Sequence, residues 1–194
     1  MRRRTTVCSR LAFRFASREP LNPTVRRRIH RTQSGNTLTK EQSMAFPFLE
    51  ENSASRRRLE ALVSRLSDED LTRSTPEGWT IAALLAHLAW WDQRVLVLLR
   101  RWKEKGVDLS PIDSQAVNDA LKPLCLALDP RTAVDLCLSS AEAVDAELET
   151  ITSHLVEQIQ ATPTHFRFSR ALHRNDHLNQ IELLLRPPQG PGGA

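Results

Sequence analysis

Ala171-Leu172-His173-Arg174-Asn175-Asp176-His177-Leu178-Asn179-Gln180-Ile181 places two histidines four residues apart near the C-terminus. On an α-helix this spacing stacks both side chains on one face, where two imidazoles can bind one divalent metal ion. Gaps of three and four residues predict a helix over 165–186, with an inward stripe of Phe166, Arg170, His173, His177, Ile181 and Leu184. The histidines therefore occupy positions that a helical bundle normally fills with leucine.

A third histidine, His87, lies in the most apolar segment of the chain, within a helix predicted over 81–103. It shares a stripe with Leu84, Trp91 and Leu98, and burial of an unpartnered imidazole costs a few kcal/mol. Judged alone, His87 is better explained as a hydrogen-bonded core histidine than as a metal ligand. The HxxxH spacing alone is likewise a weak signal.

Three inward histidines on two helices of one bundle favour a metal site over three separate core histidines. Three imidazoles leave coordination positions open, as in catalytic zinc sites, whereas structural sites are closed by four ligands. Nitrogen donors suit Zn, Ni, Fe or Cu and argue against Mg or Ca, and the absence of HExxH excludes a helical metalloprotease. We predict a divalent ion, Zn or Ni by preference, held by His87, His173 and His177, and we assign no catalytic residue.

Other polar and aromatic residues are weaker candidates. Asp92 and Asp176 could orient a histidine ring, although an ordinary surface or salt-bridged acid is the simpler interpretation of each. Trp79, Trp90 and Trp91 could line a pocket, although core packing is the simpler role for at least two of them. The remaining histidines, expected to be surface or capping residues, are His30, His154 and His165.

The rest of the chain predicts an all-α domain. Further helices are expected over 48–66, with Arg56, Arg57 and Arg58 facing solvent, and over 115–127. Asp129-Pro130 starts another helix, which a heptad stripe extends to about Ala161 and should make the longest. The apolar run of 81–91 is interrupted by charged residues after about a dozen positions, whereas a membrane span needs ~20, so we expect a buried core helix.

The charge of the chain is unevenly distributed. Residues 1–43 hold 11 of the 27 basic and 2 of the 23 acidic residues, which leaves 16 basic and 21 acidic residues in 44–194. The leader resembles an organellar transit peptide or a basic disordered arm; the favoured third interpretation is that translation starts at Met44. We expect a basic disordered leader over 1–43, a bundle over 44–186 and a disordered tail over 187–194.

The three cysteines show no paired spacing. Cys8 lies in the leader, and Cys137 lies on the apolar heptad stripe, where it acts as a small core residue. The pattern indicates a reduced, cytoplasmic protein without disulfides, and no local motif supports a cysteine nucleophile.

Two segments together resemble a known family. The run Glu77-Gly78-Trp79-Thr80-Ile81-Ala82-Ala83-Leu84-Leu85-Ala86-His87-Leu88-Ala89-Trp90-Trp91-Asp92 resembles the second helix of the DinB-like (YfiT-like) superfamily, whose pattern is "gWt…HL…wd". The run from His173 to Ile181 resembles the fourth-helix "HxxxHxxqI" of that family. The connection from Pro111 to Asn118 fits its long link, and the resemblance covers about residues 45–186.

The resemblance implies an up-down-down-up four-helix bundle with a long crossover between its second and third helices. It further implies a homodimer and one divalent metal bound by His87, His173 and His177. Members include thiol-dependent transferases and isomerases that use mycothiol, bacillithiol or glutathione, such as mycothiol-dependent maleylpyruvate isomerase, and a colibactin self-resistance hydrolase is a more distant relative. The predicted bundle ends near Arg186, so we do not expect the extra C-terminal domain of the maleylpyruvate isomerase type.

Three classes of function remain open. The first is a metal-dependent enzyme, a thiol S-transferase or hydrolase that acts on a small-molecule substrate with a low-molecular-weight thiol as cosubstrate. The second is a non-catalytic metal-binding protein of stress or damage response. The third is a structural bundle or a nucleic-acid binder that uses the basic leader, which disappears if Met44 is the start. We favour the first class, and expect neither membrane nor nucleic acid as partner.

Overall fold

The computed structural model describes residues 46–164 and 166–186, which form a helical bundle without strands. The predicted leader of 1–43, the tail of 187–194, His30 and His165 lie outside the described residues. The seven helices described are α2 (Pro47–Val63), α3 (Asp68–Thr72), α4 (Ile81–Lys105), α5 (Ser114–Leu126), α6 (Pro130–Glu149), α7 (Ser153–Ala161) and α8 (Ala171–Leu185). The all-α prediction is confirmed.

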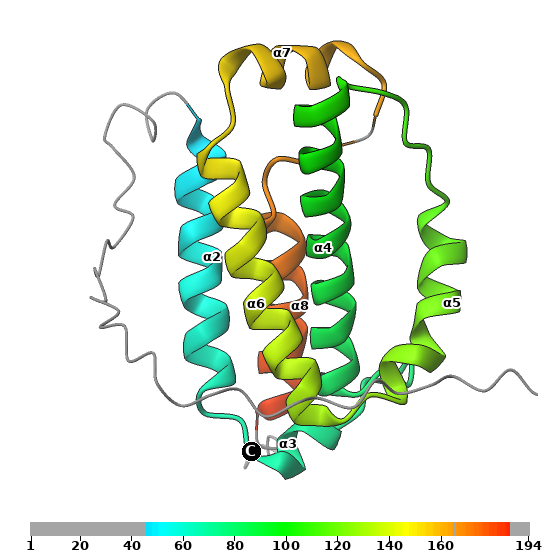
Figure 1. Ribbon diagram of the computed structural model, residues 1–194. Coiled ribbons are helices and arrows are strands. Elements are labelled where there is room, and N and C mark those ends of the chain that lie inside the picture. Colours follow the sequence, from blue (N-terminus) through cyan, green and yellow to red (C-terminus); the bar gives the residue numbers. More distant parts are fainter. Residues whose placement is uncertain (1–45, 165, 187–194) are drawn as a thin grey trace, which may run out of the picture. The chain divides into compact units, whose positions relative to one another are not determined.

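Four of these helices make the bundle (Figure 1). α2 and α8 run in one direction, and α4 and α6 run side by side in the other. The parallel pair α4 and α6 requires a long crossover, which contains α5 against the outside of α4, while α3 and α7 close opposite ends. This is the predicted up-down-down-up topology.

Local signals fix where α4 and α6 begin and end. Thr80 Oγ1 accepts a hydrogen bond from the N–H of Ala83 at 3.0 Å, and Gly106 ends α4 at φ +85°, a conformation that favours glycine. Asp129 Oδ1 accepts from the N–H of Thr132 at 2.9 Å, and Pro130 takes the first helical position of α6. These boundaries agree with the sequence prediction.

The prediction of one long helix over 130–161 is wrong. α6 ends at Glu149, and Thr152 starts α7 by accepting a hydrogen bond from the N–H of Leu155 at 3.2 Å. Ile151 and Leu155 remain buried on either side of the break, so the apolar stripe persists although the chain turns. The longest helix described is therefore α4, with 25 residues against 20 in α6.

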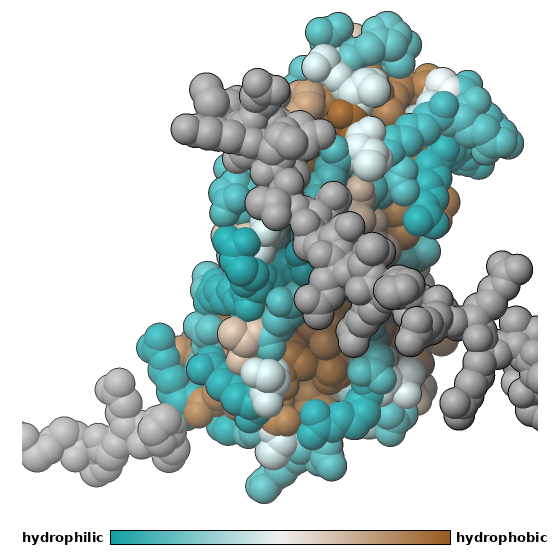
Figure 2. Space-filling view, turned by 60° about the vertical axis from the view of Figure 1, so that its left-hand side comes forward, coloured by the Kyte–Doolittle hydropathy of each residue, from teal (hydrophilic) through white to brown (hydrophobic). Residues whose placement is uncertain are grey.

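The core lies between the four bundle helices, and α4 is its centre. α4 passes the length and composition test for a membrane span, but 72% of its most apolar window is buried inside the protein. Its apolar surface is therefore covered by α2, α6 and α8 side chains, as expected for a core helix. Figure 2 shows hydrophilic residues over most of the face drawn, with apolar patches between them. Cys125 and Cys137 are free and buried, and burial raises the pKa of the Cys137 thiol.

Candidate metal centre

Three histidines converge between α4 and α8. His87 comes from α4, and His173 and His177 come from consecutive turns of α8. The Nε2 atoms of His87 and His173 lie 3.2 Å apart, and one ring nitrogen from each of the three residues lies within 4.8 Å of the other two. The ring centroids of His177 lie 4.9 Å from those of His87 and His173. The group could hold a metal ion.

The spacing can be compared with what a shared ion requires. Nitrogens ~2.1 Å from one ion in tetrahedral geometry lie ~3.4 Å apart, and no pair can exceed ~4.2 Å. The His87–His173 pair at 3.2 Å already has this spacing. The three ligand atoms lie within 4.8 Å of one another, so the widest pair would have to close by at most about 0.6 Å to share one ion. The donor set, three imidazoles without a carboxylate, fits Zn or Ni better than Mg or Ca.

Burial keeps these imidazoles neutral. Burial, with a smaller contribution from His177, lowers the pKa of His87 to about 4. Burial also lowers the pKa of His173 to about 2, with further contributions from His177 and from the positive charge of Arg170. The pKa of His177 is lowered by burial as well, although Gln180 and Asp176 oppose the shift. Neutral imidazole is the form that ligates a metal, so the site is in its ligating form at pH 7.

The side chain of Gln180 orients the ring of His177. Its Oε1 lies 3.1 Å from Nδ1 of His177 and can accept a hydrogen bond from that nitrogen, which leaves Nε2 as the acceptor or ligand atom. Nδ1 of His87 is buried and has no partner among the described residues. His177 is thus oriented by a polar side chain, whereas His87 is held by packing against Trp79 and Trp91.

A match to a family model agrees with this arrangement of helices and histidines. A model of the DinB superfamily matches residues 51–181, which include all three histidines. The chain belongs to the DinB superfamily. Searches of curated proteins and of solved structures found no match.

In this DinB superfamily protein, aromatic residues and the crossover helix surround the histidines. Trp79 and Trp91 contact the His87 ring edge-on, with centroids 5.4 and 6.2 Å away. Nε1 of Trp91 donates a hydrogen bond of 3.2 Å to Asn118 on α5. Lys122, also on α5, lies over the Trp79 ring. Both tryptophans are half-buried beside the site, and Trp79 also packs against the hydrophobic core.

The simpler interpretation of the two acids, as a salt-bridged and a surface residue, agrees with the structure, and neither hydrogen-bonds a histidine ring. Asp92 does not orient a histidine: its Oδ1 accepts from Nε of Arg170 at 2.7 Å and its Oδ2 from Nε of Arg174 at 2.9 Å. Asp176 is exposed and acts on His177 only through its charge. His154, the other histidine described, is exposed and lies on α7, outside the group. The residue that orients the His177 ring is Gln180, which lies in the run from His173 to Ile181.

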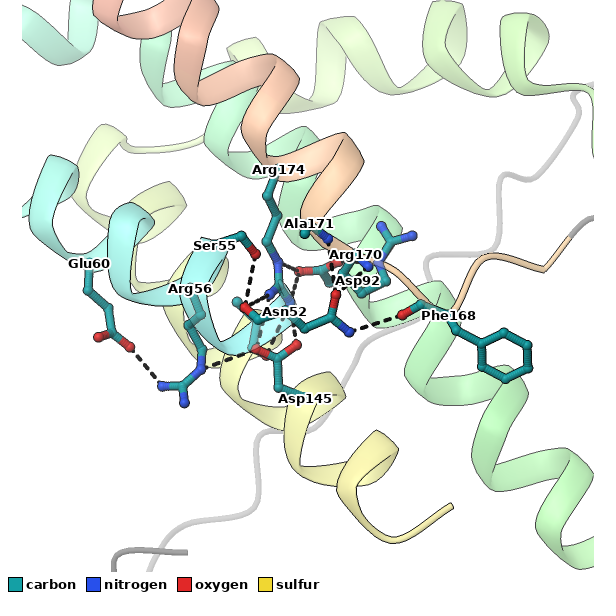
Figure 3. Close-up of polar contacts among 11 residues, drawn as sticks. Asn52, Ser55, Arg56, Glu60, Asp92, Asp145, Phe168, Arg170, Ala171 and Arg174 are labelled. Carbon is teal, nitrogen blue, oxygen red and sulfur yellow. Dashed lines mark hydrogen bonds and ion pairs between the residues drawn. The ribbon is translucent and has the colours of Figure 1, made fainter. Parts of the chain in front are cut away.

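Sequence analysis missed a buried ionic cluster beside the histidines (Figure 3). Arg174 is fully buried and pairs with Asp92 of α4 and with Asp145 of α6, at 2.9 Å each. Asp145 also accepts from Nε of Arg56, at 3.2 Å. Burial opposes the charge on Arg174, but Asp92 and Asp145 outweigh it and raise the pKa of Arg174. The residue between the two α8 histidines thus ties α8 to two neighbouring helices.

The expectation that Arg56 and Arg58 face solvent is also wrong. Both are half-buried: Arg56 reaches Asp145, and Arg58 donates to Asn175, Asn179 and Glu182 of α8. Arg57 alone is exposed as predicted. Arg56 therefore ties α2 to α6, and Arg58 ties α2 to α8.

Two surface cavities lie elsewhere on the bundle. One, of about 470 Å³, lies between α2 and α8 and is lined in part by Ala54, Arg58 and Leu172. The other, of about 430 Å³, lies near the C-terminal end of α8 and is lined in part by Arg65 and Glu182. Neither of these two cavities is lined by a histidine of the site.

Proposed function

We propose that the protein is a metal-dependent enzyme of the thiol S-transferase or hydrolase type, in which His87, His173 and His177 hold one divalent ion. The observation that carries this proposal is the convergence of three neutral ring nitrogens from two helices, with the closest pair at 3.2 Å. Three protein ligands leave one or two coordination positions for a reactant. A bound ion would supply Lewis acidity that lowers the pKa of a thiol or a water approaching those positions.

The residues around the histidines favour a thiol over water as the nucleophile. Both oxygens of Asp92 are engaged by guanidinium groups, so Asp92 is not a free general base. Gln180 cannot accept a proton, and its contribution is to hold the His177 ring. Hydrolysis normally requires a positioned base to take a proton from water, whereas a low-molecular-weight thiol has a lower pKa of its own. The proposed cosubstrate is therefore glutathione, bacillithiol or mycothiol.

Metal analysis tests the first part of the proposal. The purified full chain is stripped with chelator, reloaded with Zn or Ni, and its metal content and melting temperature are measured. We expect one ion per chain and a higher melting temperature, because the ion binds the folded state and finds no comparable site in the unfolded chain. Alanine at any of the three histidines should abolish both effects, whereas His154→Ala should change neither. Full metal content in His87→Ala would contradict the proposed ligand set.

A thiol-conjugation screen tests the second part. The loaded protein is incubated with each thiol and an electrophile such as 1-chloro-2,4-dinitrobenzene, and the conjugate is followed by absorbance. Metal-dependent turnover that disappears in His173→Ala supports the enzyme. One ion per chain without turnover for any thiol or hydrolysable ester would favour a non-catalytic metal-binding stress protein instead. The homodimer and the cytoplasmic location implied above stay predictions; light scattering of the purified chain measures the first.

A further inference from the structure

A pair of arginines lies one to two helical turns beyond the histidines, toward the end of the bundle where α8 begins. Arg94 follows His87 by seven residues, with Trp91 between them, so all three share one face of α4. Arg170 precedes His173 by three residues and is the N-cap of α8. Because α4 and α8 run in opposite directions (Figure 1), both arginines lie on the same side of the histidines.

Arg170 has an unused hydrogen-bond donor. Its side chain is 5% exposed, its Nε donates to Asp92 at 2.7 Å, and its Nη2 is buried without a partner among the described residues. Asp92 also pairs with Arg174, so one carboxylate serves two guanidinium groups. Figure 3 shows the Arg170 guanidinium beyond Asp92, on the side away from Asp145. A buried donor without an acceptor is costly, and an anion would satisfy it.

Arg94 is a second cation without an acidic partner in the described ranges. Its Nη2 donates to the carbonyl and the hydroxyl of Ser110, at 3.1 and 2.9 Å, and no ion pair is formed by its side chain within 46–164 and 166–186. These bonds attach the half-buried side chain to the crossover connection. The other N–H donors of its guanidinium group have no hydrogen-bond partner among the described residues. Arg94 follows Asp92 by two residues on α4, and Asp92 accepts from Nε of Arg170 at 2.7 Å, so the two arginines lie at the same level of the bundle. Burial and the charge of Arg170 also lower the pKa of Arg94.

The positive charge extends to the histidines themselves. Arg170 lies about one helical turn before His173, and the exposed Arg167 precedes it in the connection to α8. The only carboxylate that an ion pair of 46–164 and 166–186 places at either arginine, Asp92, is shared with Arg174. A divalent ion on neutral imidazoles would add further positive charge. The region thus lacks the negative charge that would balance it, and a substrate can supply it.

We propose that Arg94 and Arg170 form an oxyanion subsite beside the three histidines, and that the substrate is a small molecule whose carboxylate or phosphate group binds there. This inference rests on the proposed function for the role of the histidines, but the subsite itself needs no metal. Guanidinium groups pair with carboxylate and phosphate oxygens by charge-assisted hydrogen bonds. His173, His177 and Trp91 are half-buried, so each keeps part of its surface exposed to solvent. A bound anion would lie one to two helical turns from the histidines along α4 and α8.

The test uses the full chain without metal, so that an anion cannot bind to an ion instead. Malonate and inorganic phosphate are the probes, malonamide is the neutral control, and binding is measured by calorimetry. We expect saturable binding of at least one anion and none of malonamide. Arg94→Gln should weaken binding at least tenfold, whereas Arg101→Gln, an exposed arginine on the same helix, should leave it unchanged. Binding of malonate alone identifies a carboxylate substrate, and binding of phosphate alone identifies a phosphorylated one.

Arg170 requires a conservative replacement because it pairs with Asp92. Arg170→Lys keeps the charge but loses the planar fork, and we expect weaker binding of either anion at an unchanged fold; if this variant does not fold, Arg94→Gln decides alone. The subsite is refuted if neither anion binds, or if Arg94→Gln and Arg101→Gln bind as the natural chain does. Zinc content measured after the same preparations are reloaded with zinc separates the two proposals: His87→Ala should fail to take up zinc and should keep anion binding.

Discussion

Arg174 and Asp92 form an ion pair in the interior of the bundle, with Nε and Nη2 of the arginine both 2.9 Å from Oδ2 of the aspartate. Their side chains are 0% and 2% exposed. Arg174 follows His173 directly, and Asp92 lies five residues beyond His87, so the pair joins the two helices that supply the site. The position of the histidines relative to one another therefore depends on this pair.

Asp92→Asn should destabilise the protein strongly. The change removes one of the two buried negative charges that face Arg170 and Arg174 and keeps the shape of the side chain. Removal of one partner of a buried pair costs about 3–5 kcal/mol because the other charge stays uncompensated. Urea unfolding of the metal-free chain measures the loss of stability.

Glu60→Gln is the control. Glu60 is exposed and pairs with Arg56, which also contacts Asp145 of the buried cluster, so this change should alter the free energy of unfolding by no more than about 0.5 kcal/mol. Equal effects of the two changes would contradict a structural role for the buried pair.

The elements that sequence analysis predicted have local causes. Thr80 and Gly106 bound α4, Asp129-Pro130 starts α6, and histidines at leucine positions mark the site, because caps and apolar periods act over a few residues. The break between α6 and α7 escaped prediction since Ile151 and Leu155 stay buried across it. Where the chain turns without changing the spacing of its buried residues, the apolar pattern continues and does not reveal that the helix ends.

The ionic cluster could not be predicted from the sequence for a different reason. Arg174, Asp92 and Asp145 come from three helices, and each is a residue type that normally faces water. Only the packing of α4, α6 and α8 removes water from all three together. The stripe that marked the histidines as inward also contained Arg170, and that arginine was the one local sign of buried charge on α8.

Asn52→Ala should destabilise the start of α8. Asn52 lies on α2, yet its Oδ1 accepts hydrogen bonds from the N–H groups of Arg170 and Ala171 at 2.6 and 3.1 Å, and its Nδ2 donates to the carbonyl of Phe168 at 3.0 Å. It thus caps a helix 118 residues away. Loss of a cap together with a buried carbonyl contact should cost roughly 2 kcal/mol.

Chemical denaturation of the variant measures this cost, and Glu51→Ala is the matched control. Glu51 contacts the same connection through Ser169, but on the exposed surface, so its removal should cost less than about 0.5 kcal/mol. An Asn52→Ala variant as stable as the natural chain would show that α8 does not need a cap from α2.

Gln180→Ala should weaken metal binding without removing a ligand. The Oε1 atom of Gln180 lies 3.1 Å from Nδ1 of His177 and fixes the orientation of the ring, which leaves Nε2 available as the ligand atom. Loss of such an orienting group typically costs about 10–100-fold in metal affinity. Competition with a fluorescent zinc chelator measures the affinity. Gln158→Ala, an exposed position on α7, serves as control, and an affinity that is the same in both variants would show that His177 needs no support from Gln180.

Acid should destabilise the metal-free protein before it titrates the native histidines. Burial lowers the pKa of His87 from 6.5 to about 4 in the folded chain, whereas the unfolded chain keeps the ordinary value. Between these two pH values the unfolded state binds more protons than the native state, so the free energy of unfolding falls as the pH falls. The full shift corresponds to roughly 3 kcal/mol for His87.

Urea unfolding at pH 7.5, 6 and 5 measures this slope, and His87→Leu provides the comparison. Leucine fits the apolar stripe and binds no proton, so the variant should lose less stability over the same range. With zinc bound, the native chain should lose still more on acidification, because protons then compete with the ion for the same nitrogens. A slope that is identical in the natural chain and in His87→Leu would mean that His87 does not sit buried and neutral between α4 and α8, and the metal centre would lose its best-placed ligand.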